Sequence, residues 1–168
     1  QTMLPPGLGG WDPNYINKYG KYDIEEAKKL LIEAGYPDGK GIPTFTFTTT
    51  SSTSARQMAE FFVDSMSKIG IKIDVNQVDW PTFSQQIQTN QLQIWGVAWG
   101  ADYPDAQNFL QLLYGGNAAP GPNGACFNDE HFNSLYEKGS TMEQSPARDK
   151  IYKEAAQYAA ELCPWILG

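Results

Sequence analysis

The sequence has few of the features that mark a membrane-spanning or nucleic-acid-binding protein. No apolar run approaches the ~20 residues that a helix needs to cross a bilayer. Only 12 of the 168 residues are Lys or Arg, against 19 Asp or Glu, and the basic residues are scattered along the chain. A nucleic-acid-binding face needs clustered basic residues, so the net charge of −7 argues against a nucleic-acid partner.

Residue types and motifs that commonly carry catalysis are equally scarce. The single histidine, His131, falls in a predicted helix, and we expect it to be solvent-exposed rather than a catalytic base. The chain has no Gly-x-Ser-x-Gly elbow and no phosphate-binding loop. Potential metal ligands are thinly spread, and nothing indicates a cofactor. We therefore expect a protein that is not an enzyme.

Cysteine is rare as well, and the two that occur, Cys126 and Cys163, lack the Cys-x-x-Cys spacing of zinc or redox sites. Two interpretations remain open. They are two buried free thiols, or they form a disulfide if the protein is exported.

Apolar and aromatic residues, in contrast, are plentiful. The chain is 41% hydrophobic and 18% charged, as is typical of a globular domain, and its length suits one hydrophobic core. Aromatic residues make up 13%, including five Trp and nine Tyr, and such residues build both cores and flat ligand-stacking surfaces. The start at Gln1 and the apolar ending "CPWILG" suggest a piece of a larger protein.

The order of the predicted elements indicates an α/β fold. Residues 1–22 are rich in Pro, Gly and aromatics without a period, so we expect an extended leading segment, followed by a folded region over 23–168. Alternating or apolar runs predict strands over 44–50, 71–79 and 92–99, with helices between them. The third run is nearly all apolar and predicts a central strand. This β-α-β-α-β order predicts a three-layer arrangement, a parallel sheet flanked by helices.

Capping patterns place the helices. Asp23 with Glu26, and Ser54 with Gln57, predict the starts of the first two helices. Later helices are expected to begin at Pro81, near Pro104, after a cap at Asn128 and at Ser145-Pro146. Apolar stripes predict their buried faces; in the second helix the stripe is Ala55, Met58, Phe62, Met66 and Ile69, and in the last it is Ile151, Tyr152, Ala155, Ala159 and Leu162.

The polar residues at the predicted strand ends suggest a binding site. In an open parallel sheet, ligands lie at the carboxyl ends of the strands. The three predicted ends carry a row of hydroxyls over 48–52, then Asp79 and Trp80, then the segment 99–102 with Trp99, Gly100, Ala101 and Asp102. We expect these groups to gather on one rim of the sheet.

Each of these residues also has a purely structural explanation. Asp102 can cap a helix beginning at Pro104. Trp99 can belong to the core, Trp80 can pack over its own helix, and the hydroxyl row can be a solvated loop. A third alternative is enzymatic, with Asp102 and Asp105 as paired carboxylates of a hydrolase, although Asp105 would sit in a first helical turn where an acid is favourable in any case.

Several stretches resemble one family in order along nearly the whole chain. They are "YDIEEAKKLLIEAGYPDG", "IGIKIDVNQVDWPTF", "WGVAWGADYPDAQNFL", "FNDEHFNSLYEKG" and "RDKIYKEAAQYAAELCPWI". They are similar to the C-terminal lobe of family 5 extracellular solute-binding proteins, the oligopeptide and dipeptide receptors of ABC importers. The resemblance implies one lobe of a type II periplasmic-binding-protein fold whose two lobes close over a ligand.

The resemblance also implies roles and partners. Asp102 matches the aspartate that pairs with a peptide's α-amino group, and Trp80 and Trp99 match tryptophans that line the cleft. Gly100, Ala101 and Tyr103 belong to the same motif. The implied partners are a peptide, the permease subunits and a missing first lobe of the same chain, for a periplasmic or extracellular, membrane-associated monomer. Relatives that bind oligosaccharides or other solutes leave the ligand class open.

Overall fold

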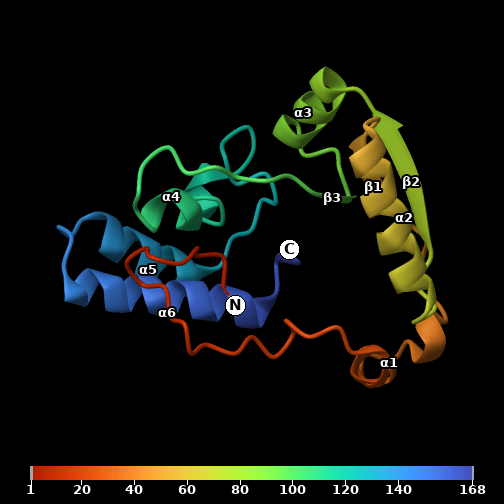
Figure 1. The fold of residues 1–168 in the computed structure, drawn as a ribbon, viewed down its shortest axis with the longest axis horizontal. Coiled ribbons are helices and arrows are strands. Elements are labelled where there is room, and N and C mark those ends of the chain that lie inside the picture. The colour runs from red at the N-terminus through yellow and green to blue at the C-terminus, as the bar shows by residue number, and fades with distance from the viewer. Residues whose placement is uncertain (1, 168) are drawn as a thin grey trace. The chain divides into compact units, whose positions relative to one another are not determined.

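The computed structural model describes residues 2–167, which pack as two compact units (Figure 1). Residues 22–97 form one of them, here called the sheet unit. The described residues of 2–21 and 98–167 form the other, the helical unit. The lobe expected over 23–168 therefore draws on both units, and its boundary stays a prediction. No helix among residues 2–167 is long and apolar enough to cross a membrane.

The sheet unit is built on three parallel strands, β1 (Phe45–Thr50), β2 (Ile73–Val78) and β3 (Ile94–Trp95). β1 pairs with β2 along its whole length, from Phe45 opposite Ile73 to Thr50 opposite Val78. The strand order is β2-β1-β3. The predicted parallel α/β sheet flanked by helices is confirmed.

The third strand differs from its prediction. β3 has two residues rather than eight, it pairs on one side only, and β1 is the central strand. Beyond β3, residues 96–99 are exposed, so the apolar run is not buried between strands within the described chain. The apolar pattern of residues 92–99 predicts that these side chains are buried, but it does not predict which part of the protein covers them.

Two helices of the sheet unit, α1 (Ile24–Glu33) and α2 (Thr53–Ser67), begin at side-chain caps. The Asp23 carboxylate accepts from the Glu26 N–H at 3.1 Å, as predicted. α1 buries none of its residues, and η1 (Pro37–Gly39) follows it. In α2 the predicted cap is wrong, because Ser52 rather than Ser54 accepts from the Ala55 N–H.

α2 packs on the sheet through one face. The Phe62 ring lies 5.2 Å from that of Phe47, and Ala59 is fully buried. Met58, expected in the buried stripe, is 63% exposed, because the contact row follows Ala55, Ala59 and Phe62. Both rows combine spacings of three and four residues, so the pattern fits either, and packing buries Ala59 rather than Met58 after Ala55.

The helical unit contains α4 (Gln107–Leu110), η2 (Gly115–Asn117), α5 (Glu130–Ser140) and α6 (Pro146–Leu162). The Ser145 cap with Pro146 at the first position is confirmed. The other two predicted starts are wrong. Asp129, not Asn128, caps α5, because Asn128 accepts from the Asn133 side chain instead, and α4 begins at Gln107 rather than near Pro104.

The core of the helical unit joins α4, α5 and α6 to the leading segment. Its buried members are Leu4, Ala106, Leu110, Leu113, Phe132, Leu135, Tyr136, Tyr152, Ala155, Ala156 and Ala159. Leu162, expected in the α6 stripe, is 46% exposed. Residues 2–21 contain no helix or strand, as predicted, yet Leu4 is buried and Asp12 pairs with Lys153 of α6 at 2.7 Å.

Both cysteines are free thiols, so the disulfide alternative is not realised. Cys126 is half-buried and Cys163 is exposed, so the expected burial holds only in part for the first and fails for the second. Both residues have positive φ at chain turns, and Cys163 ends α6 in a left-handed conformation.

A charged network lies within the helical unit. The buried Arg148 of α6 donates to an Asp105 carboxylate oxygen at 2.7 Å, to the Gly139 carbonyl at 2.9 Å and to the Tyr152 hydroxyl at 3.2 Å. Its guanidinium also lies 4.5 Å from the centroid of the Tyr152 ring. Burial raises the pKa of Tyr152 to about 12, so this hydroxyl stays protonated. The network ties the segment before α4 to α6.

The Asp105 carboxylate is ionised in this network. Burial alone would raise its pKa, but hydrogen bonds from Arg148, from the Gln107 N–H and from the Gln144 side chain bring the pKa below its ordinary value. A carboxylate with a depressed pKa stabilises the fold above its unfolded-state pKa, and this contribution is lost as the pH falls through the folded-state pKa.

Replacing Asp105 should therefore destabilise the chain and weaken its acid sensitivity. We expect Asp105→Ala to lower the free energy of unfolding at pH 7 by about 3 kcal/mol or more, because Arg148 keeps a buried, unpaired charge. The loss of stability below about pH 4 should be smaller in the variant than in the wild type. Urea denaturation at a series of pH values tests both, and an unchanged acid dependence would contradict the account.

Leu110 and Leu162 provide a matched test of the core. Leu110 is fully buried and Leu162 is exposed, although both are leucines of the same unit. We expect Leu110→Ala to cost about 2–5 kcal/mol through lost contacts and a cavity, and Leu162→Ala to cost less than about 1 kcal/mol. Amide hydrogen exchange in α6 reports the opening of this unit, and equal effects would show that the assigned core is wrong.

Candidate functional site

The candidate site residues Trp99 and Asp102 lie in one segment that ends at α4, and the side chain of Asn108 joins them. The Trp99 indole N–H donates to the Asn108 side-chain oxygen at 2.8 Å. The backbone N–H of Asp102 donates to the same oxygen at 3.3 Å, and the Asn108 amide nitrogen lies 3.5 Å from Asp102 Oδ2. The segment is therefore folded back on the first turn of α4.

The local sequence explains how Asn108 reaches this position. Asp105 Oδ1 accepts from the Gln107 N–H at 2.8 Å, which fixes the chain as it enters α4. Ala106 and Leu110 are buried on either side of Asn108 and anchor the helix in the core. Asn108 itself is fully buried, so its amide is held at the base of the segment.

Above this base the segment is open to solvent. Trp99 is 41% exposed, Tyr103 is 44% exposed, and Gly100, Ala101 and Asp102 are all exposed. The Tyr103 hydroxyl donates to Gln107 Oε1 at 3.1 Å, which holds that ring over α4. The result is a carboxylate beside an indole, on a segment whose base is fixed.

Asp102 has no ion-pair partner among residues 2–167. It does not cap a helix either, since α4 begins five residues later and its side chain contacts Asn108 instead. The capping explanation for Asp102 is therefore wrong. An exposed carboxylate next to an aromatic face can bind a cation that carries apolar groups.

The sheet unit carries the other predicted tryptophan. Trp80 is the first residue of α3 (Trp80–Gln88) and is 61% exposed, with its ring 5.9 Å from that of Phe83 in the same helix. Asp79 caps α3 by accepting from the Thr82 N–H at 2.8 Å, and hydrogen bonding to Thr82 lowers the Asp79 pKa. Trp80 thus packs partly over its own helix and still presents a free face.

The structure brings the ends of two of the three predicted strands together. Thr50 and Val78 are register partners, so the ends of β1 and β2 lie together. Thr48 and Thr49 are buried, whereas Ser51 and Ser52 are exposed and Ser52 caps α2, so the solvated-loop explanation holds only for the end of the hydroxyl row. β3 ends at Trp95, and the Trp99–Asp102 stretch belongs to the helical unit rather than to the strand end.

The hydrolase alternative finds no support in the carboxylates. Asp105 is bound to Arg148, its side chain is 13% exposed, and its lowered pKa is opposite to what a general acid requires. His131 is exposed, as predicted, with Nε2 3.8 Å from Glu154. Within residues 2–167 no group of three His, Cys, Asp or Glu side chains is placed to hold a metal ion.

Sequence reasoning missed Asn108. The available signal was an amide residue in the run "AQNFLQLL", directly before the apolar residues Phe109 and Leu110. A buried Asn in such a run needs hydrogen-bond partners, and nearby polar residues are the first candidates. Its partners, an indole and a carboxylate, could not be identified from spacing alone.

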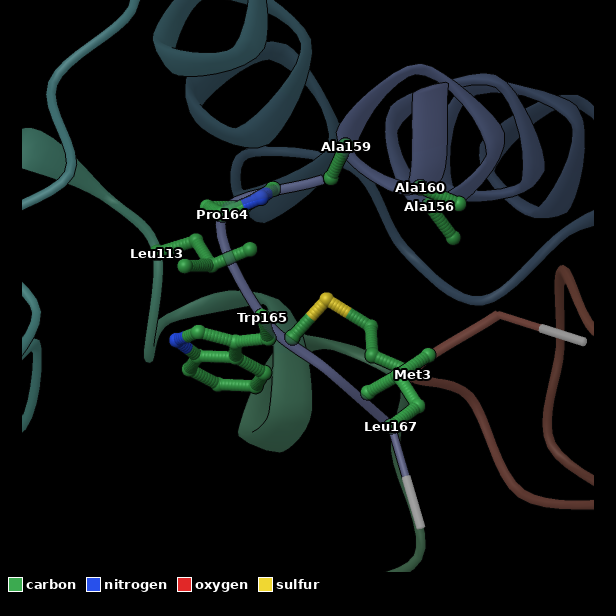
Figure 2. A pocket seen from close by; sticks show the side chains of 8 residues that line it. All are labelled: Met3, Leu113, Ala156, Ala159, Ala160, Pro164, Trp165 and Leu167. Carbon is green, nitrogen blue, oxygen red and sulfur yellow. The ribbon is translucent and has the colours of Figure 1, made fainter. Parts of the chain in front are cut away.

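The helical unit has a small cavity, shown in Figure 2, whose lining includes none of the residues 99–103. It measures about 20 Å³, room for about one water molecule, and the lining is almost entirely apolar. The lining residues are Met3, Leu113, Ala156, Ala159, Ala160, Pro164, Trp165 and Leu167. A cavity of this size is a packing defect rather than a ligand site.

Comparison with known proteins finds relatives named as heme-binding proteins and relatives named as peptide-binding proteins. Heme-binding protein A of Haemophilus influenzae is 30% identical over 168 residues, covering 99% of this chain and 30% of that protein. Di/tripeptide-binding protein 1 of Pseudomonas aeruginosa is 26% identical over 163 residues, covering 96% and 30%. The chain thus spans about 30% of the length of these curated relatives.

A solved structure agrees with them. The ABC transporter-associated periplasmic binding protein DppA from Helicobacter pylori, in complex with the peptide STSA, is 29% identical. It superposes with a TM-score of 0.86 over 97% of this chain and 31% of that one. The fold is therefore that of a portion of a periplasmic binding protein.

The family model described as "Bacterial extracellular solute-binding proteins, family 5 Middle" matches residues 1–121, well over half of the chain. The "W-x-A-D-Y" stretch at the candidate site falls inside this match. The chain belongs to the family 5 bacterial extracellular solute-binding proteins.

Proposed function

We propose that this chain is part of the ligand-binding lobe of a two-lobed receptor that serves an ABC importer. The receptor binds a peptide in the cleft between its lobes and delivers it to a membrane permease. The observation that carries this proposal is the exposed Asp102 carboxylate, without an ion-pair partner in residues 2–167, beside the exposed Trp99 indole.

In this proposal Asp102 anchors the free α-amino group of the peptide. An ammonium next to a carboxylate in a closed, water-excluding cleft forms a charge-assisted hydrogen bond, which contributes about 1.5–3 kcal/mol. Trp99 supplies an apolar wall beside it. Trp80, which belongs to the sheet unit, is proposed as a ligand contact from its match to the family's motif alone. Gly100 has open space around it, and with Ala101 it lets the peptide backbone approach, while Tyr103 borders the site.

Carboxylate chemistry favours a peptide over the other solutes of the family. A heme presents carboxylates and no ammonium, so an aspartate at the anchor position would repel it. Oligosaccharides remain the second candidate, because exposed indoles such as Trp99 and Trp80 stack on sugars as well as on peptide side chains. Neither ligand requires catalysis, and the protein acts as a receptor rather than an enzyme.

The proposed location and partners follow from the family. The receptor works outside the cytoplasmic membrane, in the periplasm or at the cell surface, associated with the membrane through its permease or an anchor. It acts as a monomer, with the permease subunits and the other lobe of its own chain as partners.

Calorimetry on the full-length receptor separates the two ligand classes. We expect the tetrapeptide Ser-Thr-Ser-Ala, or di- to pentapeptides of similar composition, to bind with micromolar or tighter affinity, and cello-oligosaccharides not to bind. Binding of the sugars alone would replace the peptide proposal with the second candidate. Turnover of a glycoside, abolished by Asp102→Asn or Asp105→Asn, would overturn the receptor proposal itself.

The anchor role predicts the effect of removing one charge. Asp102→Asn in the full-length receptor should weaken peptide binding about 10–100-fold, and N-acetylated peptides should bind the wild type equally poorly. The melting temperature should barely change, since Asp102 is exposed and caps no helix. A drop in stability with unchanged affinity would show that Asp102 serves the fold and not the ligand.

A further inference from the structure

The Asn108 side chain makes three hydrogen bonds, and all three join it to Trp99 or Asp102, the two proposed ligand contacts. Its amide oxygen accepts from the Trp99 indole at 2.8 Å and from the Asp102 backbone at 3.3 Å. Its amide nitrogen points to Asp102 Oδ2 at 3.5 Å. The Asn108 side chain itself is fully buried.

The hydrogen-bond partners of Asn108 determine which way its amide group faces. The indole N–H and the backbone N–H are donors only, so both must face the Asn108 oxygen. The NH₂ group then faces the other way, toward the Asp102 carboxylate. The oxygen of the Asn108 amide therefore positions the Trp99 ring and the Asp102 backbone, while the nitrogen contacts one oxygen of the Asp102 carboxylate.

This leaves the second carboxylate oxygen, Oδ1, without a bond to Asn108. No hydrogen bond or ion pair joins Oδ1 to any residue in the described chain. The Asn108 amide is neutral, so its contact with Oδ2 does not cancel the charge of a carboxylate. The geometry thus offers an oriented acceptor to a cationic ligand.

We propose that Asn108 is the positioning residue for amine recognition: it holds Trp99 and Asp102 in the arrangement that binds a ligand's ammonium group. The inference rests on the proposed receptor function and adds a residue that does not touch the ligand. Preorganised contacts of this kind increase affinity because the free protein has less conformational freedom to lose on binding.

Asn123 provides a matched control. It is equally buried and makes three side-chain hydrogen bonds, but these go to the Tyr114 carbonyl and to the Phe127 carbonyl and N–H. Asn123 therefore holds the loop before α5 and contacts neither Trp99 nor Asp102. A purely structural role for both asparagines predicts similar effects of both substitutions on binding.

The test compares Asn108→Leu and Asn123→Leu in the full-length receptor, with Ser-Thr-Ser-Ala and its N-acetylated form as probes. We expect Asn108→Leu to weaken binding of the free-amino peptide about 10-fold and of the acetylated peptide less than about 2-fold. Asn123→Leu should leave the preference for the free amine unchanged. Where a leucine variant fails to fold, Asn108→Ser and Asn123→Ser carry the same comparison.

A double-mutant cycle shows whether Asn108 acts through Asp102. In the Asp102→Asn background, Asn108→Leu should weaken binding clearly less than in the wild type, because the charge that Asn108 positions is gone and only its hydrogen bond to Trp99 is still lost. Equal losses in both backgrounds, or equal losses for both peptides, would overturn the proposal. So would an Asn108→Leu variant that binds like the wild type.

A readout without ligand separates this inference from the proposed function. The indole N–H resonance of Trp99 in NMR spectra should shift in the Asn108 variants and stay in place in the Asn123 variants. If Asp102→Asn leaves peptide affinity unchanged, the proposed role of Asp102 as amine anchor is wrong, regardless of any shift in the Trp99 indole resonance. If Asp102→Asn weakens binding while the Asn108 variants shift neither affinity nor the indole resonance, the positioning inference alone fails.

Discussion

The buried amide of Asn108 is the interaction on which the candidate site depends. It converts a stretch of exposed, irregular chain into a fixed surface, because one oxygen accepts both the Trp99 indole N–H and the Asp102 backbone N–H. Without it, the indole and the carboxylate would be side chains on a mobile loop. A binding site built from a short segment needs such an internal support.

The support for Asn108 comes from deeper in the helical unit. Arg148 of α6 pairs with Asp105, and Asp105 in turn accepts from the Gln107 N–H next to Asn108. Leu110, buried beside them, contributes the apolar part of the same anchor. The charge pair therefore connects the long helix α6 to the start of α4, and through it to the surface where a ligand would bind.

Local sequence patterns predicted some of the local structure. Asp23 and Ser145 cap the helices they were expected to cap, because a cap involves only neighbouring backbone groups. The caps predicted at Ser54 and Asn128 were wrong, because the nearby Ser52 and Asp129 also have capping side chains and take those positions. The length of β3 and the exposure of Met58 depend on which surfaces pack together, and this is absent from local patterns. For the site, the family motif identified Trp99 and Asp102, but the role of Asn108 was visible only in the structure. The path of the chain from residue 99 to residue 108 decides which side chains Asn108 bonds, and no local pattern predicts that path.

The central claim is that Asp102, held by Asn108, receives the amino group of a peptide. A crystal structure of the full-length receptor bound to a free-amino peptide tests it most directly. The account predicts the peptide nitrogen about 2.7–3.0 Å from Asp102 Oδ1, with the Trp99 indole still bonded to Asn108. A peptide whose amino group lies elsewhere, with Asp102 facing bulk solvent, would contradict it.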